Sequence, residues 1–477
     1  MYVALSQLRQ IISQGLCHRC GSCAGICPKN IIEPDGEYYP SWEEREKDCS
    51  DCGLCVRVCP GISFSFPEHA RLIFGKEVTV ADERGVFLKA FLGYATDRAV
   101  RESATSGGIG TGLPQYLVES GKARGAFAVV PDDAHPWKPR AIIARTRQDF
   151  ARAALSKYPA CSMNHLFRQI DREAGPFVFT GLPCHVHGLR KMAELNKKIG
   201  DQVALVIGLV CHSCLDHQAL RDIFDTYRID GKDIAKVEYR GGKLPGYIRA
   251  LTEKGDWAYL PYPQLGPDRY RPNAKECLTL FFKFHSPSRC RLCIDAMAEF
   301  ADISIGDPWV KGWEAERKLR GGYSFIIART GRGLRVLEDA QRAGAIALEP
   351  VSSDRVLTSH RPMVHLKRMR GLYNLEKRRK RGVLFPEYGF GKTFTRTERM
   401  REALRAATYA AADRPGLRRL LFRFLLSSAG RPIVGLLFFR RHVIQALLEK
   451  MKFHTQERGQ GGKPEMADNR SKRSPYG

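Results

Sequence analysis

Short apolar runs, each bounded by Gly, Ser, Pro or charged residues, dominate the middle of the chain. A continuous apolar run of about four to eight residues between turn signals is typical of a buried strand. On this pattern we predict strands at 91–96, 126–130, 141–144, 177–180, 203–210 and 303–305. Apolar positions at helical spacing predict helices at 113–120, closed by Gly121, and at 149–155. Strands and helices that alternate in this way indicate a mixed α/β domain.

The two ends of the chain lack this pattern. Residues 1–16 form a short amphipathic segment without the features of an export signal, and 66–90 is predicted to be a linker. Over 414–452, apolar groups interleave with arginines, which predicts a helical hairpin, broken near Gly430, that lies on an anionic membrane surface or packs on the core. Residues 456–477 are polar and predicted to be disordered. Because no apolar run reaches about 18 residues, a simple membrane span is not expected.

The chain has 477 residues, which is enough for roughly three domains. Most of its net charge of +26 belongs to its last quarter. From Arg361 onwards there are 28 Lys and Arg against 9 Asp and Glu, a net of +19. The remaining 360 residues carry only +7. Affinity for polyanions would therefore reside in the tail, and a nucleic-acid partner is not expected. The basic run Met363–Arg381 is most simply explained as a solvated face.

The fifteen cysteines bring in a specific chemistry. Two runs, each followed by Pro, have the spacing Cys-x-x-Cys-x-x-Cys-x-x-x-Cys, in which three thiolates hold one [4Fe–4S] cluster and the fourth crosses to the other. Gly21 and Gly53 lie inside the loops, where tight backbone is expected. Zinc sites are the alternative, and a disulfide framework is less favoured because nothing marks the chain for export. The two predicted ligand sets are Cys17, Cys20, Cys23 and Cys59, and Cys49, Cys52, Cys55 and Cys27.

A Ser/Thr/Gly-rich turn, Ser103–Gly112, follows the first predicted strand and precedes a helix. Strand, glycine turn, helix and strand is the order in which phosphate cradles are built from backbone N–H groups. The turn does not have the GxGxxG fingerprint, so a Rossmann assignment is not supported. The alternative is an ordinary βα turn that requires small residues.

Further cysteines come directly after predicted strands. Cys184 follows the strand 177–180, Cys211 follows 203–210, and Cys290 and Cys293 form a separate C-x-x-C pair. Since sites in open α/β sheets lie at strand ends, we hypothesise that these four hold a third cluster, with Cys214 competing with Cys211. Two acids, Asp302 and Asp307, bracket the strand 303–305. They either hold the ribose or ring edge of a cofactor or cap and terminate elements.

At this point the sequence resembles the family of beta subunits of coenzyme F-420-reducing hydrogenases and dehydrogenases, which also includes chlorophyll-cycle reductases. The resemblance covers residues 1 to about 345, and the segments occur in the expected order. Besides the tandem cysteine motif, the matching segments are Ser106-Gly107-Gly108, Ser156-Lys157-Tyr158, Gly181-Leu182-Pro183-Cys184, Gly208-Leu209-Val210-Cys211-His212, Tyr239-Arg240-Gly241-Gly242-Lys243, Cys290-Arg291-Leu292-Cys293 and Ala301–Asp307.

The resemblance implies an iron–sulfur flavoprotein, with FAD bound in the central α/β domain and a deazaflavin or similar two-electron partner at the flavin. It implies that the turn Ser106, Gly107 and Gly108 and the side chain of Lys157 contact FAD, and that Cys184, Cys211, Cys290 and Cys293 ligate the domain's own cluster. The sequence departs from the family at Cys214, an additional thiol, and at Leu182, where a small polar residue is common. These departures leave the third ligand set open.

Several polar residues lie close to these segments and are candidates for direct roles. Lys157, Arg240 and Lys243 are candidates to hold flavin phosphates or an acidic substrate; the alternative is a solvated surface. His185, His187 and His212 lie beside proposed ligands, so each is a candidate proton donor or a structural residue.

The fold class that follows is an α+β multidomain chain: a bacterial-type ferredoxin domain (1–65), the linker (66–90), a mixed α/β flavin-binding domain in two parts (91–175 and 176–360), a basic helical extension (361–455) and the tail (456–477).

The leading function is an oxidoreductase that exchanges electrons between clusters and coenzyme F-420 through FAD. There are two alternative functions: an iron–sulfur flavoprotein reductase of a different biosynthetic substrate near the membrane, and a non-catalytic electron-transfer subunit. A cytoplasmic location, with peripheral contact at the inner membrane face, is expected. The donor, the acceptor and the direction of electron flow cannot be derived from the sequence.

Overall fold

The structure is a computed structural model that describes residues 2–173, 175–242, 246–263, 272–308, 322–407, 409 and 414–438. The chain divides into two compact units, Met1–Arg423 and Phe424–Gly477. The three sheets of the described residues, the cysteines and the site described below belong to the first unit. In the second unit the described residues include α17 (Arg431–Phe438), and α16 (Pro415–Leu426) spans the division.

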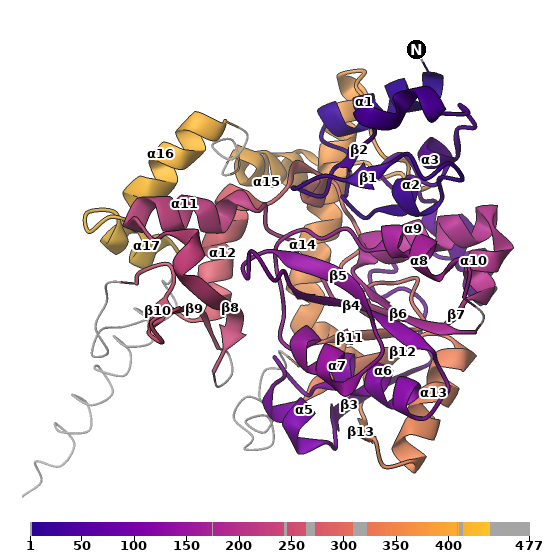
Figure 1. The fold of residues 1–477 in the computed structure, drawn as a ribbon. Coiled ribbons are helices and arrows are strands. Elements are labelled where there is room, and N and C mark those ends of the chain that lie inside the picture. The colour runs from indigo at the N-terminus through magenta and orange to yellow at the C-terminus, as the bar shows by residue number, and fades with distance from the viewer. Residues whose placement is uncertain are drawn as a thin grey trace, which may run out of the picture. The chain divides into compact units, whose positions relative to one another are not determined.

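The N-terminal region repeats one backbone motif in its two cysteine loops (Figure 1). In each loop a glycine in the left-handed region begins a one-turn helix: Gly21, with φ +84°, before α2, and Gly53, with φ +72°, before α3. Only glycine adopts this conformation without strain, which explains the two glycines expected inside the loops. The elements here are α1 (Val3–Ser13), α2 (Ser22–Gly25), β1 (Glu33–Pro34) paired antiparallel with β2 (Pro40–Ser41), a 3₁₀ helix (Glu43–Asp48) and α3 (Leu54–Arg57).

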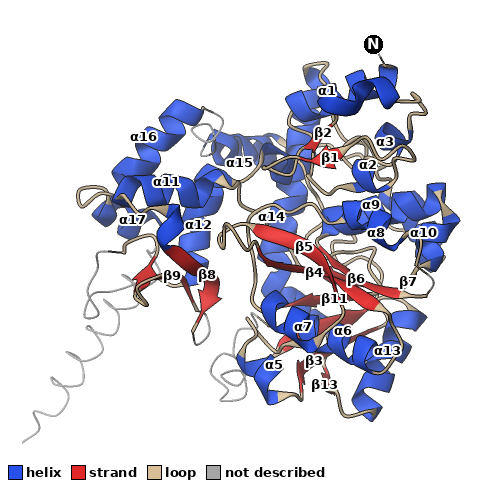
Figure 2. Ribbon diagram, viewed as in Figure 1, coloured by secondary structure: helices blue, strands red, loops and turns tan. Residues whose placement is uncertain are grey.

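In the described residues, eight strands form the central sheet in the order β13-β3-β12-β11-β7-β6-β4-β5 (Figure 2). Strands β11, β7, β6 and β4 are parallel, and β3 has the same direction because both it and β11 are antiparallel to β12. The carboxyl ends of these five strands therefore lie on one edge of the sheet, called here the carboxyl edge. The strands are β3 (Lys89–Ala95), β4 (Gly125–Pro131), β5 (Pro139–Ala144), β6 (Phe177–Gly181), β7 (Val203–Leu209), β11 (Ile303–Gly306), β12 (Ser324–Ala328) and β13 (Ile346–Pro350).

Alternate residues of the strands enter two different hydrophobic cores. In β6, Val178 packs with α6 and α13, whereas Phe177 and Phe179 on the other face pack with α9. This period of two is the geometry of a strand buried on both faces. The helices concerned are α6 (Ile109–Glu119), α7 (Arg147–Ala153) and α13 (Gly331–Arg342) on one face, and α9 (Pro183–Leu195) and α10 (Lys197–Asp201) on the other.

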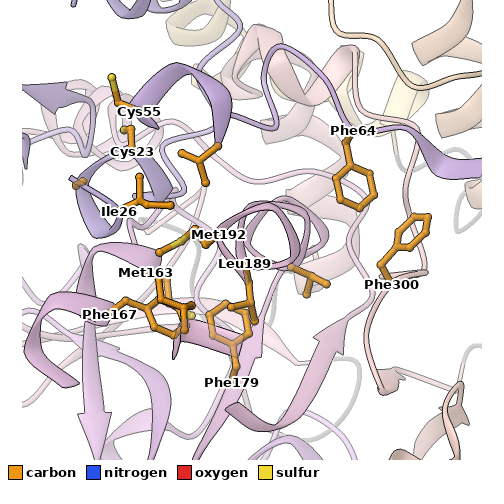
Figure 3. Close-up of a cluster of buried hydrophobic side chains, with 14 of the residues drawn as sticks. Cys23, Ile26, Cys55, Phe64, Met163, Phe167, Phe179, Leu189, Met192 and Phe300 are labelled. Atoms are coloured by element: carbon orange, nitrogen blue, oxygen red, sulfur yellow. The ribbon is translucent and has the colours of Figure 1, made fainter. Parts of the chain in front are cut away.

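The core on the α9 face is continuous with that of the N-terminal region. Figure 3 shows side chains of one cluster that come from both cysteine loops, from α9 and from the sheet. Phe64, 1% exposed, stacks between the rings of His69 and His187 at centroid distances of 3.8 and 3.9 Å. The cysteine loops and the sheet thus share a single core rather than two separate ones.

The predicted strands and helices of the central domain are all present, with boundaries within a few residues. The segment 66–90, expected as a linker, contains α4 (Phe66–Phe74), which Ser65 caps through a hydrogen bond from the Glu68 N–H. Phe66 is fully buried, so this segment is packed rather than a free connection. The boundary expected at 360/361 falls inside one continuous helix, α14 (Ser353–Lys380).

A second, smaller layer was not predicted. Strands β8 (Ile234–Gly241), β9 (Tyr247–Thr252) and β10 (Trp257–Tyr259) form an antiparallel sheet with the order β10-β9-β8. Nearby are α11 (Gln218–Tyr227) and α12 (Ala274–His285), which contact each other, and α12 also contacts β9. The remaining short elements are α5 (Arg98–Glu102), α8 (Phe167–Ile170) and 3₁₀ helices at Asn164–Leu166, Gly231–Asp233 and Ser288–Arg291.

The described part of the basic extension (361–455) includes the helices α15 (Arg396–Ala407), α16 and α17. The break between α16 and α17 spans the residues up to Gly430, where a break was predicted. Residues 439–452 of the predicted hairpin and 456–477 lie outside the described residues. A search of the described residues finds no helix with the length and apolar character required to cross a bilayer.

Candidate functional site

The two predicted N-terminal cysteine sets each surround a cavity. Cys17, Cys20, Cys23 and Cys59 line one, and Cys27, Cys49, Cys52 and Cys55 line the other. The fourth cysteine of each run thus lies with the first three of the other run, as the crossed pattern predicts. All fifteen cysteines of the chain lie in the described ranges, and all are free thiols.

Backbone groups approach the sulfur atoms at equivalent positions of the two loops. The N–H of Arg19 donates to Cys17 Sγ at 3.3 Å, and the N–H of Asp51 donates to Cys49 Sγ at 3.4 Å. Both donors have a positive φ, +59° and +51°. Because N–H···S bonds stabilise negative charge on sulfur, this turn favours thiolate in both loops.

The four thiols of the first set, and Cys55 of the second, have raised pKa values and hold their protons strongly unless a positive charge is near. Burial first, and neighbouring thiols second, raise the pKa of Cys59 to about 11 and the pKa of Cys55 to about 12. Four such groups facing one cavity would remain neutral by themselves, and positive metal charge would reverse this. The residues therefore fit iron–sulfur clusters, which require four thiolates in a shielded cavity.

A third group of thiols lies at the carboxyl edge. Cys184 begins α9 after β6, Cys211 follows β7, and their pKa values are raised by burial and, to a lesser extent, by the Cys290 and Cys293 thiols nearby. Cys214 joins them, because its Sγ lies 3.5 Å from that of Cys290. The hydrogen bond between these two thiols lowers the pKa of Cys290 and raises the pKa of Cys214. The structure thus assembles all four predicted ligands together with the competing fifth thiol.

The three groups are adjacent in space. Cys55 is among the thiols that raise the pKa of Cys23, and Cys20 is among those that raise the pKa of Cys184. The first set is therefore near both the second set and the group at the carboxyl edge. This is the arrangement that a chain of redox centres requires.

The Ser/Gly turn also lies at the carboxyl edge, after β3. Gly108, with φ +77°, begins α6 and, having no side chain, leaves the first N–H groups of that helix without a side-chain cap. Gly107 packs tightly: a Cβ there would lie 2.5 Å from Gly93 O and from Ser324 N. The hydroxyls of Ser106 and Ser324 are 3.1 Å apart, which ties the turn to β12.

The segment Ser156–Tyr158 meets this turn, because Ser156 N donates to Thr105 Oγ1 at 2.8 Å. Lys157, however, is occupied elsewhere. Its ammonium donates to the carbonyls that end α7, at 2.6 Å from Ala154 O and 2.8 Å from Ala153 O. Burial lowers the pKa of Lys157 to about 7. In this conformation Lys157 caps a helix, and the predicted contact with FAD stays a prediction.

Asp302 and Asp307 lie at opposite ends of β11 and hence at opposite edges of the sheet. Asp302, 2% exposed, accepts from Val206 N at 2.9 Å and from Thr330 Oγ1 at 2.8 Å, so it fastens β11 to β7 and to the start of α13. The position favours the capping alternative for Asp302. Asp307 lies at the carboxyl edge and forms an ion pair with Arg240, which is 5% exposed. Lys243 lies outside the described residues.

The candidate histidines differ in their surroundings. His185 uses both ring nitrogens: Nδ1 accepts from Leu182 N at 3.2 Å and Nε2 contacts Cys161 O at 3.0 Å. Burial lowers its pKa to about 4, so it is a neutral support of the Cys184 turn rather than a free proton donor. His187 contacts Asp295 Oδ2 at 2.9 Å in the core. His212 is half-buried at the carboxyl edge, and burial together with Arg370 and Lys367 lowers its pKa to about 3.

Two buried cations near the thiols were missed at the sequence level. Lys367, from the run interpreted as a solvated face, is 2% exposed and donates to Cys211 O at 2.7 Å. Arg289, 1% exposed, donates to Pro60 O and Tyr388 Oη. Arg289 precedes Cys290 directly, which was a usable signal. For Lys367 the signal was the helical spacing of Val364, Leu372 and Leu375, which are buried on the same face of the helix.

An arrangement of this kind is that of an iron–sulfur electron-transfer protein, and comparison with known proteins agrees. Residues 16–61 match the 4Fe-4S dicluster domain. Residues 90–168 match the N-terminal part, and residues 176–354 the C-terminal part, of the coenzyme F420 hydrogenase/dehydrogenase beta subunit. The chain belongs to this family of beta subunits, as its segments predicted.

Similar proteins include a reductase and two hydrogenase subunits. The coenzyme F420-dependent sulfite reductase of Methanocaldococcus jannaschii is 25% identical over 76% of this chain, and the chain spans only 52% of that protein. The coenzyme F420 hydrogenase subunit beta of Methanothermobacter thermautotrophicus is 25% identical over 56% of this chain and 86% of its own length. The corresponding beta subunit of Methanosarcina barkeri is 24% identical over 56% and 83%. A solved F420-reducing [NiFe] hydrogenase complex from Methanosarcina barkeri gives a TM-score of 0.49 at 23% identity over 65% of this chain and 98% of that chain.

Proposed function

We propose that this chain is an iron–sulfur flavoprotein that exchanges electrons between three [4Fe–4S] clusters and coenzyme F420 through FAD. The observation that carries the proposal is the convergence, at one edge of the sheet, of the Ser106–Gly108 turn and the third thiol group. Ligands of open α/β sheets bind at this edge, where strands end and helices begin.

The residues present at the carboxyl edge fit a flavin nucleotide. Gly107 lets the turn pack closely on β3 and β12, and α6, eleven residues long, begins after Gly108 with uncapped N–H groups that could bind a pyrophosphate. The edge is partly open, since Ser106, His212 and Asp307 are half-buried. When bound, a flavin exchanges either one electron at a time or a pair, which couples clusters to an organic two-electron substrate.

The chain's own residues supply position and shielding. The Arg240–Asp307 pair fixes the end of β11 against β8, and His185 holds the turn that carries Cys184. Cys17, Cys20, Cys23 and Cys59 would hold the first cluster, Cys49, Cys52, Cys55 and Cys27 the second, and Cys184, Cys211, Cys290 and Cys293 the third. The names of the relatives support F420 as the substrate and a protein partner such as another component of a hydrogenase.

The direct test is to mix anaerobically reduced protein with oxidised F420 in a stopped-flow spectrometer. We expect the F420 absorbance to bleach with a rate that rises with protein concentration. Flavin released by acid from the same preparation should be FAD in about equal amount to the chain. Bound FAD without bleaching would favour the alternative substrate, and iron without flavin would favour a non-catalytic electron-transfer subunit.

The turn is tested by exchanging single glycines. Gly107→Ala places a Cβ 2.5 Å from backbone atoms, so the turn must move, and we expect flavin retention at least about tenfold weaker, as from a loss of about 1.4 kcal/mol. Gly391→Ala, outside the turn, is the control, because a Cβ there would meet nothing within 4 Å. FAD and iron are measured on both variants. Equal FAD in the two variants would exclude the turn as the cofactor site.

A further inference from the structure

Helix α14 extends beyond the part of the chain that matches the family, which ends at residue 354, and forms one wall of the third thiol group. Asn374 Nδ2 donates to Arg291 O at 3.0 Å. A Cβ on Gly371 would lie 3.1 Å from Cys293 O, so the helix backbone lies directly on the loop that carries Cys290 and Cys293. Tyr388, after the helix, donates to Leu292 O at 3.2 Å. The extension is therefore part of the site.

Lys367 is the residue of α14 that places a charge there. Its Nζ is hydrogen-bonded to Cys211 O at 2.7 Å, and the side chain is buried. Removing an ammonium group from water costs several kcal/mol unless negative charge compensates it. The buried carboxyl group of Asp295 is among the neighbours of Lys367, and on the proposed assignment the thiolates of Cys211, Cys290 and Cys293 would add further negative charge around it.

Arg289 is a second buried cation, situated between the first and third thiol groups. Its Nη2 donates to Pro60 O at 3.2 Å, next to Cys59, and its own chain continues into Cys290. Within the described residues, Arg289 Nε and Nη1 have no hydrogen-bond partner. A guanidinium with unpartnered nitrogens in the protein interior is stabilised by negative charge nearby, and on the proposed assignment the thiolates of Cys293 and Cys59 would supply it.

A cluster held by four thiolates is anionic and becomes more so on reduction. A fixed positive charge in a shielded interior therefore stabilises the reduced form more than the oxidised form. The surface basic residues of the tail cannot act in this way, because water and salt screen them.

We propose that Lys367, a residue of the extension outside the family-matched region, is the fixed cation that raises the reduction potential of the third cluster, with Arg289 acting on the first and third clusters together. The inference rests on the proposed third cluster. It assigns to the extension a redox-tuning role in place of the solvated face that its composition suggested.

The test is an anaerobic redox titration of the full-length protein followed by electron paramagnetic resonance. Lys367→Gln keeps a donor for Cys211 O and removes the charge, whereas Lys367→Arg keeps the charge. For Lys367→Gln we expect the reduction constant of the third cluster to fall at least about tenfold, a shift of about 59 mV for one electron. The first and second clusters should keep their potentials, and Lys367→Arg should match the wild type.

Lys380→Met is the control, since Lys380 lies on the same helix with 63% of its side chain exposed, and it should leave all potentials unchanged. Iron and sulfide analysis of the wild type tests the third cluster separately from the role of Lys367. Iron for two clusters only would refute the proposed third cluster, whereas iron for three with an unmoved potential in Lys367→Gln would refute the role of Lys367 alone. If Lys367→Gln fails to assemble the cluster, Lys367→Met is titrated instead. Loss of the cluster in both variants would likewise overturn the tuning role in favour of an assembly role.

Discussion

Replacing Cys290 and Cys293 together by serine is expected to remove about one third of the iron and sulfide of the anaerobic protein, while the two N-terminal clusters survive. The reason is geometric: both residues belong to the thiol group at the carboxyl edge, and neither lines the N-terminal cavities. The measurement is iron and sulfide per chain, together with the resonance signal of the reduced protein. An unchanged iron content in the double variant would show that these thiols hold no cluster.

The matched control for that experiment is Cys277→Ser. Cys277 is fully buried in α12, donates to Leu260 O and Pro272 O, and lies in none of the three thiol groups, so this serine exchange should keep all the iron. Cys214→Ser, measured in the same assay, tests whether Cys214 is a ligand of the third cluster. With Cys184, Cys211, Cys290 and Cys293 as ligands, the cluster should remain in Cys214→Ser; its loss would place Cys214 among the ligands.

Phe64→Ala is expected to lower the free energy of unfolding by about 3–5 kcal/mol, the range for truncating a buried aromatic side chain. Phe64 is stacked between two imidazole rings and also meets Phe66 and Phe300, so the vacated space is enclosed by rings that cannot easily collapse. Anaerobic denaturant titration, read by far-UV circular dichroism, measures the change.

Leu72→Ala on α4 is the comparison for Phe64→Ala. Leu72 is 65% exposed, and a surface truncation of this kind should change the free energy of unfolding by no more than about 0.5 kcal/mol. A similar loss in the two variants would mean that the stability of the chain does not depend on the core around Phe64.

The sequence carries most of the information on elements and on thiol groups, and the reason is that both are local. Apolar runs identified the strands that hold Phe179 and Val206, and cysteine spacing identified which thiols share a cavity. Cys184 and Cys211 were placed correctly because each follows a strand, and parallel strands end at the same edge.

The features that the sequence could not predict depend on strand direction or on contacts between distant segments. Asp302 and Asp307 lie at the two ends of one strand, and only its parallel pairing with β7 shows that Asp307, not Asp302, lies at the edge with the cysteines. Lys367 contacts Cys211, 156 residues away, and its place in the sequence does not show which distant segment covers it. The three-stranded sheet was missed because its strands β8 and β9 carry charged residues such as Lys236 and Arg249 within them.

The shared core has a consequence for how this chain handles electrons. In a tethered carrier, a small ferredoxin on a flexible linker moves between a donor and an acceptor, and this diffusion limits the rate of electron transfer. Here the aromatic packing around Phe64 and α9 joins the cysteine loops to the sheet, so the separation between the first and third thiol groups is built in during folding. With clusters in these thiol groups, as proposed, electrons would pass between fixed positions, and the viscosity of the medium would act only on the arrival of partners.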